Sequence, residues 1–251
     1  MILLEHHLKS LRLPTFLKCY KDVADQCRKK GVDYSDYLSQ LSEMEVSNRH
    51  NRAVQQRIKK ARFPTLKTLD SFDFDAVPAL NQRQVCELAT SDYIERHENI
   101  IALGNSGTGK THVSIALGMA ACQRGLSVLF TTAAALVHEL LEAREEKQLL
   151  RLQKRLNTYP LLIIDELGFV PFSKTGAELL FEIFSNRYER GSILVTSNLP
   201  FQEWTQIFGC ERLTGALLDR LTHHVHILEM NGESYRLLQS KKGKNNLPQK
   251  K

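Results

Sequence analysis

The sequence predicts an α/β protein in which a five-stranded parallel sheet follows a small, all-helical N-terminal domain. From Asn99 onwards, short apolar runs alternate with stretches of helical periodicity, and a glycine-rich loop follows the first run. In residues 1–63, by contrast, apolar side chains recur at helical spacing. Strands that alternate with helices form a parallel sheet covered on both faces, so the main domain belongs to the α/β class.

Five apolar runs are the predicted strands of this sheet, and polar or helical segments separate them. The clearest helix runs from Thr175 to Arg190, because Thr175 and Glu178 have the spacing of a capping box and Gly191 follows the last turn. The predicted strands are 99–103, 128–131, 161–164, 192–196 and 225–228.

The helical domain is assigned to residues 1–64, the ATPase domain to 65–240 and a basic, disordered tail to 241–251. Pro14 and Gly31 separate the first two amphipathic stretches, and Asp33 is a plausible N-cap for a third. A further, strongly basic helix is predicted over 48–63. Its cationic side chains are Arg49, Arg52, Arg57, Lys59, Lys60 and Arg62.

Positive charge is concentrated at the two ends of the chain. Residues 1–64 hold thirteen Lys and Arg against seven Asp and Glu, and the tail holds five lysines and no acid, although the whole chain carries only +6. Basic ends of this kind favour a partner with phosphates, because each Lys or Arg that binds a phosphate releases a counterion. Asn51 and Gln55 are too few for base reading, so the basic helix predicts contact with the backbone of duplex DNA. Solvated surface charge is the alternative interpretation.

Composition narrows the class of protein further. A hydrophobic content of 42% and a charged content of 25% are ordinary for a soluble protein, and no apolar run is long enough to cross a bilayer. The five cysteines are scattered and never form a C-x-x-C pair. We therefore expect free thiols, a cytoplasmic location and no membrane association.

The strongest motif is a phosphate-binding loop between the first strand and an apolar helix. Its sequence fits G-x-x-x-x-G-K-[ST] without a mismatch. Its backbone N–H groups would face the phosphates of ATP, Lys110 would hold the β- and γ-phosphates, and the Thr111 hydroxyl would bind Mg²⁺. The loop consists of Gly104, Asn105, Ser106, Gly107, Thr108, Gly109, Lys110 and Thr111.

An acidic pair, Asp165 and Glu166, follows the third strand, where ligands of parallel sheets bind. Asp165 is predicted to hold Mg²⁺ and Glu166 to polarise the attacking water, which favours a hydrolase over a kinase. The sequence has no N-K-x-D segment for reading guanine, so adenine is the expected base.

Four other polar residues are candidates for completing catalysis. Asn198 follows the fourth strand and is predicted to orient the attacking water beside Glu166. Arg220 and Arg236, with Arg212 as a competitor, can meet the charge that develops on the phosphates, from the same chain or from a neighbouring subunit. Surface salt bridges explain any single one of these arginines about as well.

These motifs together resemble the IstB/DnaC branch of the AAA+ ATPases, with Leu-Ile-Ile-Asp-Glu166, Thr-Ser-Asn198, Leu-Leu-Asp-Arg220 and Ser-Tyr-Arg236 beside the glycine loop. The segment 160–170 is more similar to the transposon helpers than to the helicase loaders. The resemblance implies that Asn198 is the sensor residue, Arg220 the finger acting in trans and Arg236 the second sensor. It also implies ATP-dependent homo-oligomerisation on DNA and recruitment of a cognate transposase. A DnaC-like loader that acts through protein contacts is the alternative.

Two further groups of side chains receive ordinary structural interpretations. His223, His224 and His226 have no cysteine or carboxylate at metal-binding spacing, so they are expected to flank the last strand without a metal. Phe72 and Phe74 line the adenine pocket or pack in the core, and the sequence does not decide between the two.

Overall fold

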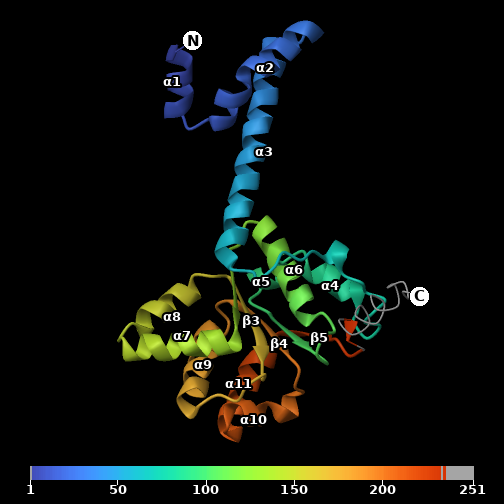
Figure 1. The fold of residues 1–251 in the computed structure, drawn as a ribbon, viewed down its shortest axis with the longest axis vertical. Coiled ribbons are helices and arrows are strands. Elements are labelled where there is room, and N and C mark those ends of the chain that lie inside the picture. Colours follow the sequence, from blue (N-terminus) through green and yellow to red (C-terminus); the bar gives the residue numbers. More distant parts are fainter. Residues whose placement is uncertain (1, 233, 236–251) are drawn as a thin grey trace, which may run out of the picture. The chain divides into compact units, whose positions relative to one another are not determined.

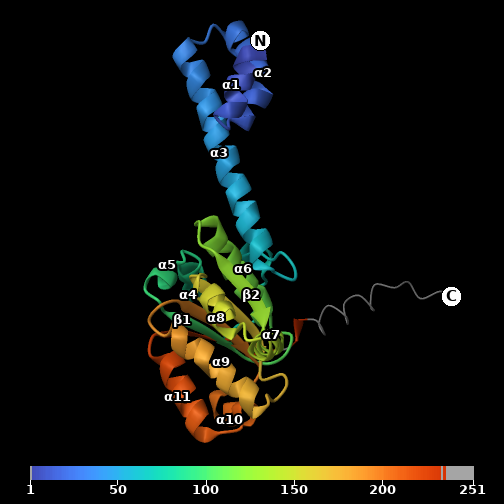
Figure 2. The same cartoon turned by 90° about the vertical axis from the view of Figure 1, so that its left-hand side faces the viewer.

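The computed structural model describes residues 2–232, 234 and 235, and Figures 1 and 2 show its ribbon in two views. The chain divides into two compact units, Met1–Gln56 and Arg57–Lys251.

The first unit is helical. It contains α1 (Ile2–Ser10), α2 (Pro14–Lys30) and most of α3 (Tyr34–Ala61), which continues into the second unit. Pro14 begins α2 and Gly31 ends it in the left-handed conformation that glycine adopts without strain. The expectation of a separate basic helix over 48–63 was wrong, because α3 runs without interruption through residues 44–48, where neither proline nor glycine occurs.

The small core of this unit comprises Val23, Cys27 and Leu41, with aromatic rings of α2 and α3 packed around them. At one edge, the carboxylate of the buried Glu45 accepts a hydrogen bond of 2.8 Å from the backbone N–H of Thr15. Because the first N–H groups of a helix lack partners within the helix, Glu45 acts as a distant cap for α2.

The second unit is an α/β domain whose central sheet is parallel throughout, as predicted. The strand order is β2-β3-β4-β1-β5, so β1 lies between β4 and β5, which come much later in the sequence. The strands are β1 (Asn99–Leu103), β2 (Val128–Thr132), β3 (Leu161–Leu167), β4 (Ser192–Ser197) and β5 (Val225–Glu229). The helices are η1 (Leu69–Ser71), α4 (Gln82–Leu88), α5 (Asp92–Glu95), α6 (Lys110–Gln123), α7 (Ala133–Glu145), α8 (Leu149–Asn157), α9 (Lys174–Arg187), η2 (Phe201–Glu203), α10 (Trp204–Phe208) and α11 (Glu211–Thr222).

Two hydrophobic layers cover the two faces of this sheet. Alternate strand residues point to opposite faces, so Ile100 belongs to the layer under α6, and Ile101 to the layer under α7 to α11. Ala61 at the end of α3 belongs to the α6 layer and is fully buried there. Among the described residues, no helix combines the length and apolar character needed to span a membrane.

Helix α9 begins differently from the prediction. Ser173, not Thr175, is the N-cap, and its hydroxyl accepts a hydrogen bond of 3.2 Å from the N–H of Gly176. Both residues are good capping types, but Phe172 is held by a backbone hydrogen bond to Ile207, so the chain enters the helix earlier.

The end of α9 holds a buried guanidinium. Arg187 donates hydrogen bonds to the carbonyl oxygens of Leu156, Tyr159, Pro160 and Ser192, at 2.9 to 3.1 Å. Burial lowers the pKa of Arg187 to about 10, and it remains a cation at neutral pH. The four carbonyls stabilise this charge and join α8, α9 and the starts of β3 and β4.

Candidate nucleotide-binding site

The glycine loop connects the carboxyl end of β1 to the first residue of α6. Two glycines of the loop are required by close packing as well as by positive φ angles. A Cβ added to Gly104 (φ 150°) would lie 2.1 Å from the carbonyl oxygen of Met230, and one added to Gly109 (φ 92°) would lie 2.6 Å from the Phe72 ring. The backbone therefore forms a narrow cradle that ends at the positive end of the α6 dipole, which suits a chain of phosphates.

Lys110 and Thr108 shape the interior of this loop. The Lys110 ammonium donates to the carbonyl oxygens of Gly104 and Asn105, at 2.7 Å each, and the Thr108 hydroxyl donates to the same Asn105 oxygen at 2.9 Å. Lys110 and Thr108 are buried, whereas Asn105 and Ser106 are exposed at the tip. The single ammonium therefore lies inside the curve of the loop, where it can reach a bound phosphate.

Asp165 lies at the edge of the sheet directly beside this loop. The Thr111 hydroxyl is 3.1 and 3.0 Å from the two carboxylate oxygens of Asp165, and the Thr196 hydroxyl donates to one of them at 2.5 Å. Asp165 is buried and belongs to β3, while Thr196 belongs to the neighbouring β4. A hydroxyl and a carboxylate this close are hard oxygen donors, so the residues fit Mg²⁺.

Glu166 points away from the sheet because the strand is irregular at this residue. Its φ angle is +60°, and the pairing of β3 with β4 shifts register between Ile164 and Leu167. The Glu166 N–H donates to the Thr196 hydroxyl at 2.9 Å, and Ser197 donates to the carbonyl oxygen of Leu167 at 2.7 Å. These two hydrogen bonds fix the bulge, so that Asp165 is directed inward while the Glu166 side chain is exposed.

The structure brings only some of the sequence-predicted residues to this edge. Asn198 is exposed and follows β4 directly, close in the chain to Thr196. Arg220 lies near the end of α11, at the amino end of β1 and therefore opposite the loop. Its neighbour Leu221 shows this placement, because the Leu221 carbonyl accepts a hydrogen bond from the Asn99 side chain at the start of β1. Arg236 lies outside the described residues.

Arg220 is held in a defined position at that opposite edge. Its guanidinium donates to the carbonyl of Ala216 at 2.7 Å and lies 5.0 Å from the centre of the Phe181 ring. The competing Arg212 is exposed in the first turn of the same helix.

The predicted DNA-contacting residues differ from one another in their surroundings. In the first unit, Arg49 contacts Glu45 at 3.0 Å and the Arg12 carbonyl at 2.9 Å, and Arg52 contacts the Thr15 hydroxyl at 3.1 Å. These two arginines therefore take part in the packing of α2 against α3. In the second unit, Arg57 is half-buried. Of the predicted DNA-contacting residues in this unit, the exposed ones are Lys59, Lys60 and Arg62.

Two residues near the site were not assigned a role from the sequence. Thr196 contacts both acids of the pair, and its only sequence signal was its place in Val-Thr-Ser-Asn198 after an apolar strand. His112 follows Thr111 and contacts the Thr68 carbonyl at 2.9 Å, while its ring lies 5.2 Å from that of Phe72. Through His112 and Gly109, the segment around η1 is packed against the start of α6.

The fold and the site together define a P-loop ATPase of the AAA+ class. The five-stranded parallel sheet carries the phosphate loop after β1, the acidic pair in β3 and a polar residue after β4. The chain belongs to the family of IstB-like ATP-binding proteins, whose pattern matches residues 6–243.

Two relatives from insertion sequences are similar over almost the whole chain. The IS21 putative ATP-binding protein of Pseudomonas aeruginosa is 39% identical over 239 residues, which is 95% of this chain and 90% of the relative. The IS5376 putative ATP-binding protein of Geobacillus stearothermophilus is 40% identical over 230 residues, or 90% of each chain.

Solved structures with low sequence identity share the fold. DnaA from Aquifex aeolicus, bound to AMPPCP, has a TM-score of 0.58 and 22% identity over 76% of this chain. This chain covers 58% of that DnaA chain, so the likeness is partial. The DnaC helicase loader has a TM-score of 0.53 and 19% identity over 69% of this chain and 98% of the loader.

Proposed function

We propose that this protein is a magnesium-dependent ATPase that assembles as a homo-oligomer on duplex DNA and recruits or regulates the transposase of its insertion sequence in the cytoplasm. Support comes from the phosphate loop with its acidic pair and from the relatives, which are named as putative ATP-binding proteins of insertion sequences. The helical domain (1–64) supplies the DNA-binding surface and the domain 65–240 the ATPase activity. The basic tail (241–251) lies outside the described residues.

The chemistry assigned to the site follows from its oxygen and nitrogen donors. Lys110 holds the β- and γ-phosphates, Thr111 and Asp165 hold Mg²⁺, and Glu166 polarises the attacking water with Asn198 beside it. When bound, Mg²⁺ neutralises charge on the phosphates. The exposed position of Glu166 supports its role, because its carboxylate faces away from the core while Asp165 is engaged by two hydroxyls.

A shared site between subunits is supported by the place of Arg220. The loop follows the last residue of β1, and Arg220 lies near the first. Because β1 has five residues, its two ends lie about 13 Å apart. This separation favours a role for Arg220 at the phosphates bound by another subunit. Arg212 and Arg236 remain alternatives for this role.

The observation that carries the DNA-binding proposal is a group of exposed cations at and just after the end of α3, called here the cationic end of α3: Lys59, Lys60 and Arg62. This end packs against α6, the helix that begins at the phosphate loop. A Cβ added to Gly118 in α6 would lie 2.9 Å from the Phe63 ring, and Arg57 lies near Gly125 just beyond α6. A movement of the start of α6 on nucleotide binding therefore reaches the cationic end of α3 through few contacts.

The test is the affinity for unrelated duplexes measured against salt concentration, with ATP, ADP or no nucleotide. For the double variant Lys59→Ala/Lys60→Ala we expect uniform weakening and a salt slope reduced by roughly two units, about one per cation removed. Lys29→Ala/Lys30→Ala is the matched control, since it removes two exposed lysines at the end of α2. An equal loss in both variants would mean that only overall charge matters and would contradict a DNA surface at the end of α3.

A DnaC-like loader is the alternative proposal, favoured by the match to nearly the whole length of the DnaC loader. It predicts no duplex binding under any nucleotide and an ATPase rate that responds to a protein partner only. The same titration therefore separates the two functions.

A further inference from the structure

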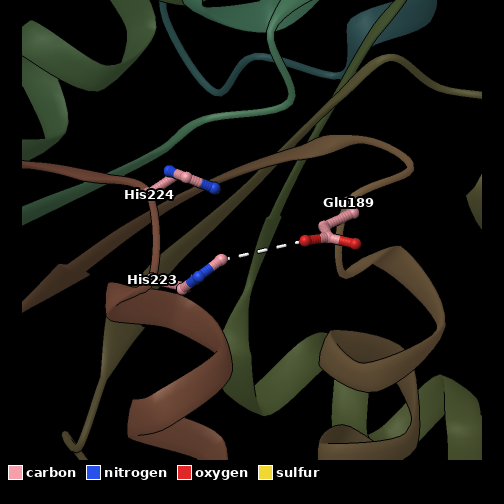
Figure 3. A group of neighbouring side chains, drawn as sticks. All are labelled: Glu189, His223 and His224. Atoms are coloured by element: carbon pink, nitrogen blue, oxygen red, sulfur yellow. Dashed lines mark ion pairs between the residues drawn. The ribbon is translucent and has the colours of Figure 1, made fainter.

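Three potential metal ligands meet at the edge of the sheet opposite the nucleotide site (Figure 3). Glu189 lies in the turn after α9, and His223 and His224 lie between α11 and β5. One ligand atom from each of the three lies within 4.8 Å of the other two, and all three residues are exposed. Figure 3 shows the Glu189 carboxylate directed toward His223 across the gap between the two turns.

The structure separates the three histidines that the sequence places together. His226 is used elsewhere, because its Nε2 atom lies 2.7 Å from the carboxylate of Glu98. His223 Nδ1 lies 3.9 Å from a Glu189 carboxylate oxygen, and the His223 and His224 rings are 4.1 Å apart. No carboxylate lies at metal-binding spacing from these histidines in the sequence, but Glu189, which is distant in sequence, is adjacent to His223 and His224 in space.

The turns hold the three side chains in reach of one another. Glu189 has a φ angle of +57°, and the following Gly191 donates to the Arg187 carbonyl at 3.1 Å, which fixes the turn. The His224 carbonyl accepts a 2.8 Å hydrogen bond from the N–H of Asn99, which fixes the other turn on β1. The backbones are therefore anchored, while the exposed side chains can rotate.

We propose that Glu189, His223 and His224 bind a divalent transition metal ion of the Zn²⁺ class, with water as the remaining ligand. Tetrahedral Zn²⁺ with bonds of about 2.0–2.1 Å requires ligand atoms roughly 3.3 Å apart, so the three atoms need only small side-chain rotations. Two imidazoles and one carboxylate favour Zn²⁺ over Mg²⁺, which prefers oxygen ligands alone.

The bound ion links the turn after α9 to the end of α11. The Tyr188 hydroxyl, 3.1 Å from His223 Nδ1, gives up this contact if Nδ1 becomes the ligand. Arg220 is three residues before His223, and the ring beneath its guanidinium, Phe181, belongs to α9. The metal therefore restrains the two elements that position Arg220, although the site itself does not depend on the proposed function.

The test is a Zn²⁺ titration of the full-length, nucleotide-free protein by calorimetry, with Co²⁺ absorption as a second probe. Wild type should bind with a stoichiometry of one and give the intense visible bands of four-coordinate Co²⁺. Glu189→Gln and the double variant His223→Ala/His224→Ala should each weaken Zn²⁺ binding by at least about tenfold and lose these bands. His138→Ala, which removes an exposed histidine of α7, should leave both unchanged.

Far-ultraviolet circular dichroism and the melting temperature confirm that each variant is folded. Wild-type affinity in either cluster variant overturns the proposal, as does a loss of equal size in His138→Ala. Weakening in the histidine variant alone also overturns it, because Glu189 would then not be a ligand.

Discussion

At the scale of single residues, Thr196 joins the two acids of the site. Its hydroxyl accepts from the Glu166 N–H and donates to the Asp165 carboxylate. Thr196→Val keeps the shape but leaves both groups without this partner, so we expect a loss of about 1–3 kcal/mol in stability and slower ATP hydrolysis. Urea unfolding and steady-state turnover measure the two effects.

Thr196→Ser is the matched control, because it keeps the hydroxyl and removes only the methyl group. Wild-type-like behaviour is expected from it. If Ser and Val are equally poor, the methyl packing of Thr196 matters and its hydrogen bonds do not.

The two acids should be separable by mutation. Glu166→Gln removes the group that we propose polarises the attacking water, so ATP and Mg²⁺ should still bind while hydrolysis slows by about 10²–10⁴-fold. Asp165→Asn should in addition weaken the part of nucleotide binding that depends on Mg²⁺. A fluorescent ATP analogue titrated with and without Mg²⁺ makes the comparison, and identical binding defects in both variants would contradict the division of roles.

At the scale of secondary structure, Glu45 stabilises the start of α2 from the middle of α3. Burial by itself raises the pKa of Glu45, but hydrogen bonds from Thr15 and the nearby Arg49 outweigh it, and the pKa is below its usual value. A lowered pKa in the folded state means that the carboxylate stabilises the helical unit at neutral pH. That contribution disappears as the pH falls through the lowered pKa.

We therefore expect Glu45→Ala to destabilise the helical unit by about 1–3 kcal/mol at pH 7, with a smaller difference from wild type at acidic pH. Hydrogen exchange of the α2 amides, followed by mass spectrometry, reports the change locally. Glu43→Ala is the control, since Glu43 is exposed on the same helix. Equal protection of α2 in the wild type and in Glu45→Ala at pH 7 would rule out the cap.

The strands were predictable because their apolar runs are continuous and are bounded by polar or glycine residues. All five predicted strands are present, extended by one to three residues in four cases. The residues at which helices begin and end were less predictable. The sequence predicted Thr175 as the N-cap of α9, whereas Ser173 is the cap, and Phe172 just before it donates a backbone hydrogen bond to the distant Ile207. Likewise, the change to basic composition at Asn48 does not interrupt α3, because charge alters the surface of a helix and leaves its backbone intact.

At the scale of the whole molecule, the separation of Arg220 from the loop predicts complementation between subunits. Arg220→Ala and Lys110→Ala proteins should each be inactive alone, because an arginine acting in trans contributes about 10³–10⁵ in rate and Lys110 is proposed to hold the phosphates. Mixed assemblies contain some interfaces with both residues intact and should recover part of the ATPase activity. Verified co-assembly without any recovery would place the two residues in the same subunit's site or outside catalysis.

The candidate site was predictable wherever its chemistry is local in sequence. The glycine loop and the acidic pair are contiguous motifs, and the carboxyl ends of parallel strands bring them together. Contacts between segments distant in sequence were not predictable: Thr196 in β4 contacts Asp165 in the neighbouring β3, and Glu189 after α9 lies beside His223 after α11. The basic residues also looked equivalent in sequence, whereas Arg49 and Arg52 are engaged in packing.

The position of β1 inside the sheet has a consequence for the timing of synthesis. Its neighbours, β4 and β5, are translated long after it, and the loop that follows it packs against Met230 and accepts a hydrogen bond at Gly107 from the N–H of Tyr235. At about 5–20 residues per second, a ribosome needs on the order of ten seconds to pass from the glycine loop to these partners. During that interval the nascent chain carries the nucleotide motif without the segments that form its walls. ATP binding is therefore a property that the chain acquires only after the segment up to Tyr235 has been synthesised.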